Sequence, residues 1–469
     1  MICGKCKDEK NTPEFTKLNI SKNGEVGLCK KCKKERDHIS KSKKKKNDEL
    51  LEYFELKGDL LKRPESNTRI GFLKLYKFTD RKVSKNKKFE ELPNVGAMAV
   101  LGELIDPYGY CFIEDINKYS YILISLTSVM DIENLIYTFE RFAPKNIKPK
   151  IIIGGFGVCN IKLITQYIDV AVWGRAEGQI NGIIAGNEYS NVWRKDKDPE
   201  LKGQYKVRQP KYLVKGEVSV GCRNNCSYCQ YTSIRKPLNN GEIYNPGSNY
   251  TNAIESDWNG LNITKPGLYT SAWDGWSDYT RGKVHKPVSN KAIVDKIVNI
   301  SNKGFDGGVA IKVFQIVGYP WETKDSVLRD IQDTYRMLIG ISNQLKSRVV
   351  LTFMCTPFGP EPLTPMANNS ADIQTDWHNV ISKIKKYDDG TLCLAMIPSV
   401  SGPFTLVKRM LIHRAETKDL DRYKKIVFSS KLNGMNNNIK VAWLLKYGII
   451  KENEFKEWDG KSIEYLSVE

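Results

Sequence analysis

Three cysteines, Cys222, Cys226 and Cys229, lie in one short stretch with the spacing C-x3-C-x2-C, and Tyr228 precedes the third. Three thiolates on one loop can ligate three corners of a cubane [4Fe–4S] cluster, whereas ordinary ferredoxin clusters take four cysteines. A missing fourth ligand leaves one iron open to a substrate or cosubstrate, much as catalytic zinc sites keep an open position. The alternative is a structural zinc site that takes a ligand from elsewhere in the chain. The spacing favours the iron–sulfur cluster.

Four further cysteines near the start of the chain form a second candidate metal site. Two C-x2-C pairs can each aim both thiolates at one ion, and together they complete the closed tetrahedral site that is typical of structural zinc. Because so small a module cannot bury a core, the metal would supply its folding energy. The alternative is two redox pairs, which normally open helices in a thioredoxin-like unit. The predicted zinc ligands are Cys3, Cys6, Cys29 and Cys32.

The first fifty residues are also strongly basic. They hold 15 Lys and Arg against 8 Asp and Glu, including the run 43–46 of four lysines. Such density attracts phosphate backbones through counterion release, so a nucleic acid or nucleotide substrate is expected. A solvated linker is the plainer interpretation of a lysine run alone.

Composition limits the class of protein. The chain has 469 residues, a formal net charge of +19 and 41% apolar residues, which indicates several folded domains. No run of 18 apolar residues occurs, and the first ten residues do not resemble a signal peptide, so no membrane partner is expected. The segment CGKCKDEKNTPEF…GLCKKCKKERDHISK resembles the small zinc-knuckle modules at the front of phage and bacterial nucleic-acid-processing proteins. We therefore expect a cytoplasmic protein, in the host cytoplasm if a phage encodes it, with cysteines that bind metal rather than form disulfides.

Strands and helices alternate after a charged connector. Strands are expected at 69–76, 121–126, 151–153 and 170–173, and helices at 95–104, 132–142 and 161–167. This alternation implies a parallel sheet covered by helices, whose ligands bind at the carboxyl ends of the strands. Glycines and small hydroxyl residues there would let a bulky cofactor approach the backbone, although the glycines alone could simply turn the chain. The candidate cofactor residues are Ser125, Thr127, Ser128, Gly154, Gly155, Gly174 and Glu177.

A second set of elements surrounds the three cysteines. A short strand at 218–220 leads into the cysteine loop, strands are expected at 310–317 and 349–354, and an amphipathic helix at 324–338. The default interpretation is that four other cysteines are simply small buried hydrophobic residues. These are Cys111, Cys159, Cys355 and Cys393.

The segment GEVSVGCRNNCSYCQY resembles the signature of the radical S-adenosylmethionine (SAM) superfamily. GYPWET at 318–323 resembles the family's G-x-P-x-E-T turn near the SAM adenine, and 356–366 is close to its F-x-P-x-P-x-T-P segment. The segment 269–281 occupies the place where polar side chains hold the SAM ribose and carboxylate. The resemblance implies a partial (β/α)6 barrel with its site at the strands' carboxyl ends. The SAM-binding candidates that it implies are Tyr228, Ser271, Asp274, Ser277, Arg281, Gly318 and Glu322.

The strands and helices within 66–200 resemble the cobalamin-binding-type domain of the B12-binding branch of this superfamily. The segments that carry this resemblance are LISLTS, IIIGGFG and VWGRAEGQI. One departure is that many cobalamin domains ligate cobalt with a histidine, whereas none of the four histidines falls in 66–200. An empty domain kept as a scaffold is the alternative. Methylthiotransferases carry a second cluster on three cysteines, but only Cys111 and Cys159 are available here.

The expected fold class is therefore α/β, with four parts. The first two are a phage-like zinc-knuckle module with a basic tether (1–50) and a Rossmann-like domain of the B12-binding type (66–200). They are followed by a radical SAM partial barrel (211–400) and a C-terminal extension (401–469) that caps the barrel or adds substrate contacts. The expected cofactors are a [4Fe–4S] cluster, SAM, Zn2+ and, as a candidate, cobalamin. We expect an enzyme that modifies a nucleic acid or nucleotide, with cobalamin-dependent C-methylation favoured and an external one-electron donor of the flavodoxin or ferredoxin type. The alternatives are a rearrangement of a hypermodified base without cobalamin, and a nucleic-acid-binding iron–sulfur protein.

Overall fold

The structure, a computed structural model, describes residues 69–78, 95–211, 219–222, 224–235, 237–239, 258–398, 402–456 and 463–468. All of them belong to one compact unit, Ser66–Glu469. The four cysteines predicted to bind zinc lie outside the described residues, so the zinc module stays a prediction. No described helix is long and apolar enough to cross a membrane.

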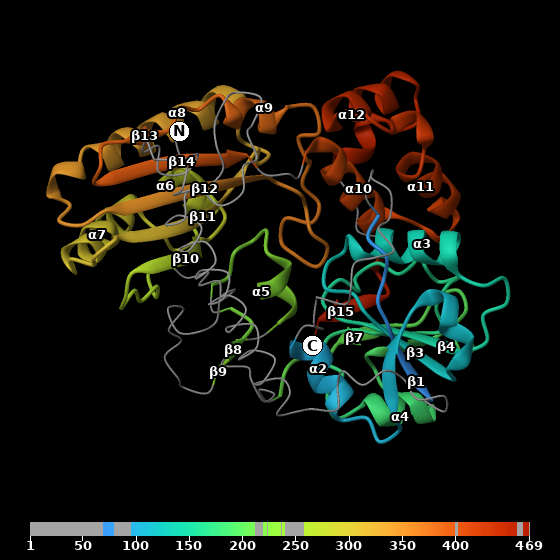
Figure 1. The fold of residues 1–469 in the computed structure, drawn as a ribbon. Helices are drawn as coiled ribbons and strands as arrows, with labels where there is room; N and C mark the ends of the chain where they lie inside the picture. The colour runs from blue at the N-terminus through green and yellow to red at the C-terminus, as the bar shows by residue number, and fades with distance from the viewer. Residues whose placement is uncertain are drawn as a thin grey trace, which may run out of the picture. The chain divides into compact units, whose positions relative to one another are not determined.

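Among the described residues, the first sheet has six strands in the order β2-β1-β3-β4-β5-β6. Figure 1 labels β1, β3 and β4 of this sheet. The first five in that order are parallel, an arrangement found in doubly wound sheets, and β6 is an antiparallel edge strand. Its strands are β1 (Ile70–Leu73), β2 (Tyr108–Cys111), β3 (Tyr121–Ser125), β4 (Lys150–Gly154), β5 (Val170–Val172) and β6 (Val192–Arg194). Its helices are α2 (Val95–Gly102), α3 (Asp131–Phe142) and α4 (Ile180–Ala185).

The helix predicted at 161–167 is wrong. Two successive turns replace it, in which the Ile164 amide donates to Ile161 and the Tyr167 amide donates to Ile164. The side chain of Asn160 accepts a hydrogen bond from the Lys162 amide at 3.1 Å, and the amide of Ile161 donates to the hydroxyl of Tyr465. The amides of residues 161 and 162 would have no partner within a helix in any case, so these bonds fix where the segment begins and do not by themselves exclude a helix.

The second sheet has five strands in the order β10-β11-β12-β14-β13, with β13 antiparallel at the edge. Its strands are β10 (Gly267–Ala272), β11 (Val309–Val317), β12 (Val349–Pro357), β13 (Tyr387–Asp388) and β14 (Leu392–Pro398). The cysteine loop follows β8 (Ser219–Val220), which pairs with β9 (Leu238–Asn239) in a separate two-stranded sheet. The described residues thus show four parallel strands beside an antiparallel one, and the six-stranded partial barrel stays a prediction.

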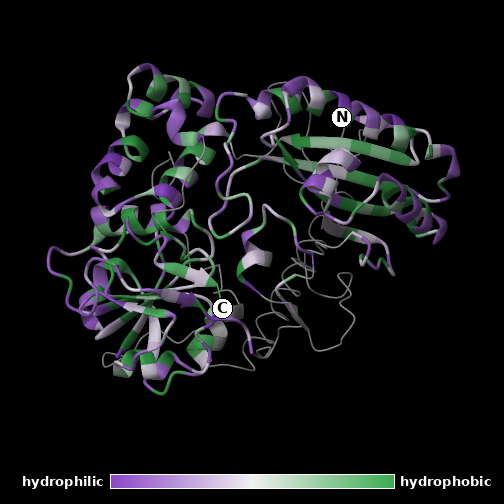
Figure 2. Ribbon diagram, turned by 180° about the vertical axis from the view of Figure 1, so that it is seen from behind, coloured by the Kyte–Doolittle hydropathy of each residue, from purple (hydrophilic) through white to green (hydrophobic). Residues whose placement is uncertain are grey.

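One face of the second sheet carries its core. Along β11 the residues alternate between buried and half-buried, and the buried ones pack against helices that follow the strands. The longest of these helices begins at a capping box in which Thr323 and Ser326 bond reciprocally. Strands drawn largely in green and helices banded green and purple in Figure 2 reflect this one-sided burial. The helices are α5 (Gln230–Ile234), α6 (Asp278–Lys283), α7 (Asn290–Asn302), α8 (Lys324–Ile339) and α9 (Trp377–Ser382).

The C-terminal helices share a core with the first sheet. Phe404, Val407 and Met410 belong to the same buried cluster as Leu126 and Ile161. Strand β15 pairs with β7, and Asn160 donates to three carbonyls at the end of α10, Ile412, His413 and Ala415. The extension thus shares a core with the first sheet, and its Arg409 also pairs with Glu361 of the segment after β12. That it caps the barrel or adds substrate contacts stays a prediction. The elements are β7 (Tyr205–Val207), α10 (Pro403–Arg414), α11 (Leu420–Val427), α12 (Asn437–Lys446) and β15 (Leu466–Val468).

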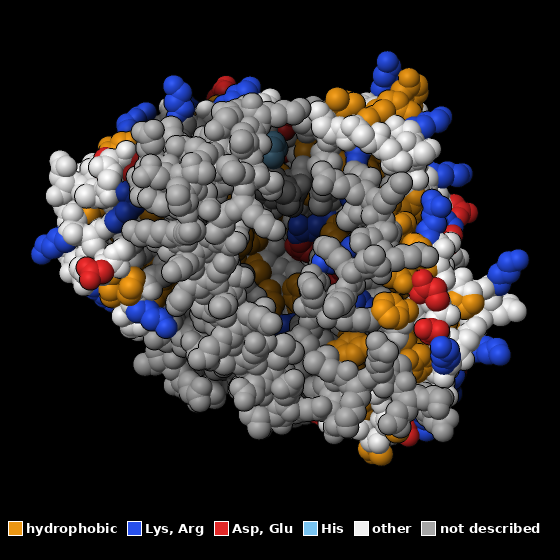
Figure 3. All heavy atoms as spheres, in the orientation of Figure 1, with side chains coloured by type: hydrophobic (Ala, Val, Ile, Leu, Met, Phe, Trp, Pro, Cys, Tyr) orange, Lys and Arg blue, Asp and Glu red, His pale blue; other side chains and the backbone are white. Residues whose placement is uncertain are grey.

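Lysine and arginine side chains, blue in Figure 3, project along the edges of the described part of the face shown there. This distribution agrees with the formal net charge of +19 of the whole sequence.

Candidate functional site

The cysteine loop is fixed by bonds to two distant segments. Gly221 begins it with a φ of 74°, and Cys229 ends it as the residue before α5. The amide of Ser227 donates to the carbonyl of Val284 at 3.0 Å, and the amide of Met366 donates to the carbonyl of Ser227 at 3.1 Å. Cys226 is buried, whereas Cys222 and Cys229 are partly exposed. The loop therefore presents thiols to the surface from a fixed backbone.

The chemistry of this loop fits an iron–sulfur cluster. No set of three metal-ligating side chains among the described residues is gathered around a common point. Burial raises the pKa of the Cys226 thiol to about 11, against the nearby ammonium of Lys286, which lowers it. Iron binding replaces the thiol proton, because the thiolate is the ligand. Three thiols on one loop beside a cation thus suit a negatively charged cluster.

A buried ion pair lies against the cysteine loop. The ammonium of Lys286 is 2.8 Å from the carboxylate of Asp274, with only 2% and 11% of the two side chains exposed. Burial lowers the pKa of Lys286, but the Asp274 carboxylate outweighs it, so the pKa is raised overall. Asp274 follows β10 with a φ of 59°, and its carbonyl accepts a hydrogen bond from the Tyr319 hydroxyl at 2.8 Å. The pair places the ammonium of Lys286 beside the cysteines, with the carboxylate of Asp274 balancing its charge.

The turn after β11 is built around one carboxylate. Glu322 accepts hydrogen bonds from the amides of Gly318 and Tyr319 at 2.9 and 3.1 Å, and from the Thr280 hydroxyl at 3.0 Å. Burial raises the pKa of Glu322 to about 7, although these bonds lower it. Gly318 has a φ of 75°, and a Cβ there would lie 2.7 Å from the indole nitrogen of Trp377. Only glycine suits this position.

The other predicted SAM-binding residues differ in what they contact. Ser271 is fully buried in β10, and its hydroxyl has no hydrogen-bond partner among the described residues. Ser277 caps α6 by accepting from the Thr280 amide. The buried guanidinium of Arg281 bonds Val288, Gly275, Asp278 and Asn290, so it anchors the α6 segment. Tyr228 is half-buried and packs edge-on against Tyr319. Their contacts with SAM stay predictions.

Sequence reasoning missed Lys286, Thr280 and Tyr319. Tyr319 lies inside the GYPWET motif, which was a signal that could have found it. Thr280 lies inside the segment 269–281, which was a signal too, whereas Lys286 stands in no motif and only the fold brings it to Asp274.

The candidate cofactor residues of the first sheet are engaged by the chain itself. Asp131 accepts from the amide and hydroxyl of Thr127 and from the amide of Ser128. A Cβ on Gly155 would lie 2.4 Å from the carbonyl oxygen of Leu126, and one on Gly174 would lie 2.2 Å from that of Arg208. Glu177 is buried and pairs with Arg175 at 3.0 Å. These glycines therefore serve the close approach of backbone to backbone.

Gly154 and Ser125 end neighbouring strands in register with each other. A Cβ on Gly154 would find only Val172, at an ordinary 3.9 Å, so this glycine is not required by packing.

The glycine-rich loop after β4 nevertheless meets the cysteine loop. Gln230, the residue after Cys229, donates to the sulfur of Cys159 at 3.0 Å and to the carbonyl of Pro362 at 3.2 Å. Phe156 and Tyr231 place their ring centroids 5.7 Å apart. The two predicted cofactor regions are thus neighbours in the fold.

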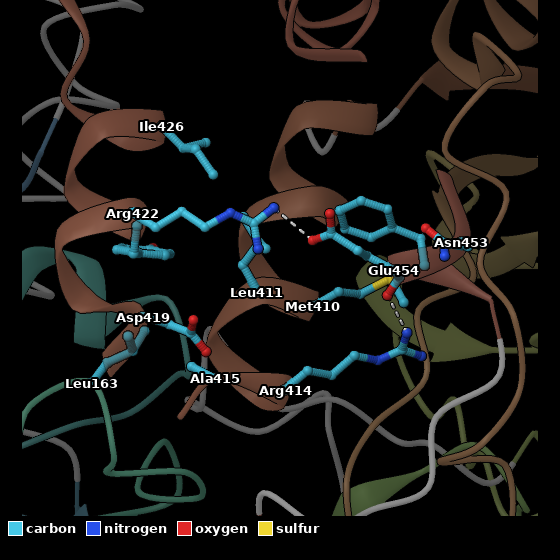
Figure 4. Close-up of a pocket in the computed structure, with 12 residues that line it drawn as sticks. Leu163, Met410, Leu411, Arg414, Ala415, Asp419, Arg422, Ile426, Asn453 and Glu454 are labelled. Atoms are coloured by element: carbon cyan, nitrogen blue, oxygen red, sulfur yellow. Dashed lines mark hydrogen bonds and ion pairs between the residues drawn. The ribbon is translucent and has the colours of Figure 1, made fainter. Parts of the chain in front are cut away.

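Two cavities lie apart from these residues. One, of about 440 Å³, opens between α10 and α11 (Figure 4), where Arg422 pairs with the carboxylate of Glu454 and Arg414 donates to its carbonyl. The other, of about 820 Å³, lies between α8 and α9. None of the predicted site residues lines either cavity.

No protein-family model matches the chain, and no curated protein matches it. Among solved structures it is similar to TsrM, a radical SAM methyltransferase from Kitasatospora setae. The form with tryptophan and a SAM analogue bound gives a TM-score of 0.39 at 11% identity over 66% of this chain and 76% of that one. The form with cobalamin and a [4Fe–4S] cluster gives 0.29 at 10% identity over 72% and 84%.

The chain is also similar to OxsB, a cobalamin-dependent SAM radical enzyme, with a TM-score of 0.26 at 10% identity over 61% of this chain and 44% of that one. These similar structures are radical SAM enzymes of the cobalamin-dependent kind. At such TM-scores and identities the likeness does not establish the cofactors or the reaction of this chain.

Proposed function

We propose that this protein is a radical SAM enzyme. The observation that carries the proposal is the C-x3-C-x2-C loop, which lies against the Asp274–Lys286 pair and close to Tyr319 of the Gly318–Glu322 turn. Asp274 and Gly318 both follow the carboxyl ends of parallel strands, where sheets of this kind bind their ligands.

The residues around the cysteine loop would have different roles in binding the cluster and SAM. Cys222, Cys226 and Cys229 would hold a [4Fe–4S] cluster, which when bound supplies the electron that splits SAM into methionine and a 5′-deoxyadenosyl radical. Lys286 would offset the negative charge of the cluster, and Asp274 keeps Lys286 in place. Glu322 fixes the turn at Gly318 against which the adenine would rest. Tyr319, Trp321 and Phe358 pack ring on ring beside this turn and would keep water from the radical.

Two chemistries remain for the radical. C-methylation that uses cobalamin is favoured by the sequence pattern of the first sheet and by the contact between its glycine-rich loop and Gln230. A rearrangement without cobalamin is favoured by the packing of Gly155 and Gly174 against the chain's own backbone. Corrinoid absorption bands after incubation with hydroxocobalamin and gel filtration would support methyl transfer, and their absence would leave the rearrangement.

We further propose that the substrate is a nucleic acid or nucleotide, with residues 1–50 as a zinc-binding, basic attachment module. Deleting residues 1–50 should weaken the binding of a mixed-sequence polynucleotide and flatten its salt dependence. Unchanged affinity in the shortened protein would remove the main support for this part.

The central test is SAM cleavage. Protein reconstituted with iron and sulfide without oxygen, then reduced with dithionite, should convert SAM to 5′-deoxyadenosine. The Cys226→Ala variant should bind less iron and form none, whereas Cys393→Ala, which alters a buried cysteine of β14, should behave like the unaltered protein. If the reconstituted protein forms no 5′-deoxyadenosine, the protein is better described as a nucleic-acid-binding iron–sulfur protein.

A further inference from the structure

The second sheet has a face that none of its described helices covers. Residues buried against α7 and α8 alternate along β11 and β12 with half-buried ones that point to the opposite side. On that opposite side, Leu268 at one edge strand is 71% exposed and Ile397 on β14 is 44% exposed. We call this face of the sheet, with its half-buried residues and two exposed apolar side chains, the open face.

One lysine stands in the middle of the open face. Lys312 lies on β11, in register with Thr270 of β10 and with Thr352 of β12. All three side chains are half-buried, and none of them makes a hydrogen bond or ion pair with another described residue. Neighbouring strands are about 4.8 Å apart, so the two threonines flank Lys312 on both sides within the row. The next residue in this row, Ala395 of β14, is small and leaves space beside Thr352.

The row is chemically suited to an oxyanion. A partly buried ammonium without a carboxylate loses hydration without gaining a partner, and an anionic ligand would restore both charge and hydrogen bonds. The row holds one positive charge and up to five donor hydrogens, with no acidic residue in register. It would therefore prefer a phosphate or carboxylate to a cation or a neutral group.

The next row toward the cysteine loop is apolar. Ala272, Phe314, Met354 and Ile397 share one register two residues further along the strands. At about 3.3 Å per residue along the strand, this apolar row lies about 7 Å from Lys312, and Gly318 lies about 20 Å from Lys312. A ligand held by its anionic end at Lys312 would lay an apolar or aromatic body on Phe314 and Met354 and point toward the predicted SAM site.

We infer that Lys312, Thr270 and Thr352 form an oxyanion-binding row for a small molecule or nucleotide that carries a phosphate or carboxylate at one end of an apolar body. This inference deepens the proposed function, because it names the substrate class of the same barrel. The carboxylate of SAM itself has the required chemistry too, and the two sources can be told apart by experiment.

The test uses the full-length reconstituted protein, with inorganic phosphate and SAM as separate probes. Equilibrium dialysis against labelled phosphate should show Lys312→Met binding at least tenfold more weakly than the unaltered protein, and Lys312→Arg binding within a few-fold of it. Lys418→Met is the matched control, because Lys418 is exposed and lies in the C-terminal part of the chain. It removes the same charge and should leave phosphate binding unchanged, and the lysine-rich first fifty residues are identical in all four proteins.

The outcomes distinguish a substrate anion from the carboxylate of SAM, and both from a wrong inference. Weaker phosphate binding with normal SAM affinity in Lys312→Met assigns the row to a substrate, and a tenfold loss of SAM affinity with normal phosphate binding assigns it to the carboxylate of SAM. If Lys312→Met binds both probes as the unaltered protein does, the inference is wrong. The phosphate arm needs no SAM cleavage, so it can succeed where the radical SAM proposal fails, and the reverse also holds.

Discussion

The carboxylate of Glu322 offers a quantitative test of the turn after β11. Burial raises its pKa from an ordinary 4.5 to about 7, so the folded protein keeps a proton that the unfolded chain has lost between these two values. Stability should therefore fall as the pH rises through this window. Since one pKa unit is worth about 1.4 kcal/mol, the full difference is about 3 kcal/mol, and about 2 kcal/mol after allowance for the solvent that reaches the side chain.

The perturbation is Glu322→Gln, which keeps the shape and removes the charge. The glutamine oxygen can still accept from the amides of Gly318 and Tyr319, and its amide group can donate to the Thr280 hydroxyl. Urea unfolding followed by tryptophan fluorescence at pH 5, 6, 7 and 8 gives the comparison. The unaltered protein should lose about 2 kcal/mol more than the variant between pH 5 and pH 8. Parallel pH profiles for the two proteins would refute a carboxyl buried in this way.

Three further predictions address the packing around the site. Gly318→Ala should lower the free energy of unfolding by about 1–3 kcal/mol, because alanine at a φ of 75° is strained and its Cβ meets Trp377. Thermal unfolding of this variant is compared with that of Gly390→Ala, whose Cβ meets nothing, so that backbone strain is separated from crowding. Asp274→Asn and Lys286→Met should each lower the free energy of unfolding by about 3–5 kcal/mol. The double variant should lose less than the sum of the two, which a double-mutant cycle of urea unfolding would measure. Additive losses would mean that the two residues are not coupled. Asn160→Ala should cost about 1–3 kcal/mol and speed hydrogen exchange at the end of α10, because three carbonyls lose their donor; unchanged exchange there would contradict this.

The strands could be predicted from the sequence where their pattern is local. The alternation in VAIKVFQIV and the apolar run in KIIIG predict β11 and β4, because strand burial has a period of two residues or covers both faces. The segment 161–167 has apolar residues at helical spacing but forms turns, and the amide of Ile161 at its start donates to Tyr465, about 300 residues away. Such a bond leaves no signal near the residues that it affects.

The candidate site shows the same division. The cysteines could be found because their chemistry depends on spacing along the chain. Lys286 could not be found, since its relation to the cysteines depends on how the chain after α6 returns to β10. The glycines of the first sheet were found, but their role was not predictable, because the backbone that Gly174 admits belongs to Arg208.

The first sheet helps to position the cysteine loop whether or not it binds a cofactor. Gln230 is fixed on one side by Cys159, which follows β4 of the first sheet, and on the other by Pro362, which follows β12 of the second. Since Gln230 directly follows Cys229, a shift of either sheet would move a predicted cluster ligand. A cofactor-free first sheet would therefore still be required to build the site, which gives a physical reason for a scaffold domain in an enzyme that does not use cobalamin. In an enzyme that does, the same contact would bring the second cofactor close to the cluster.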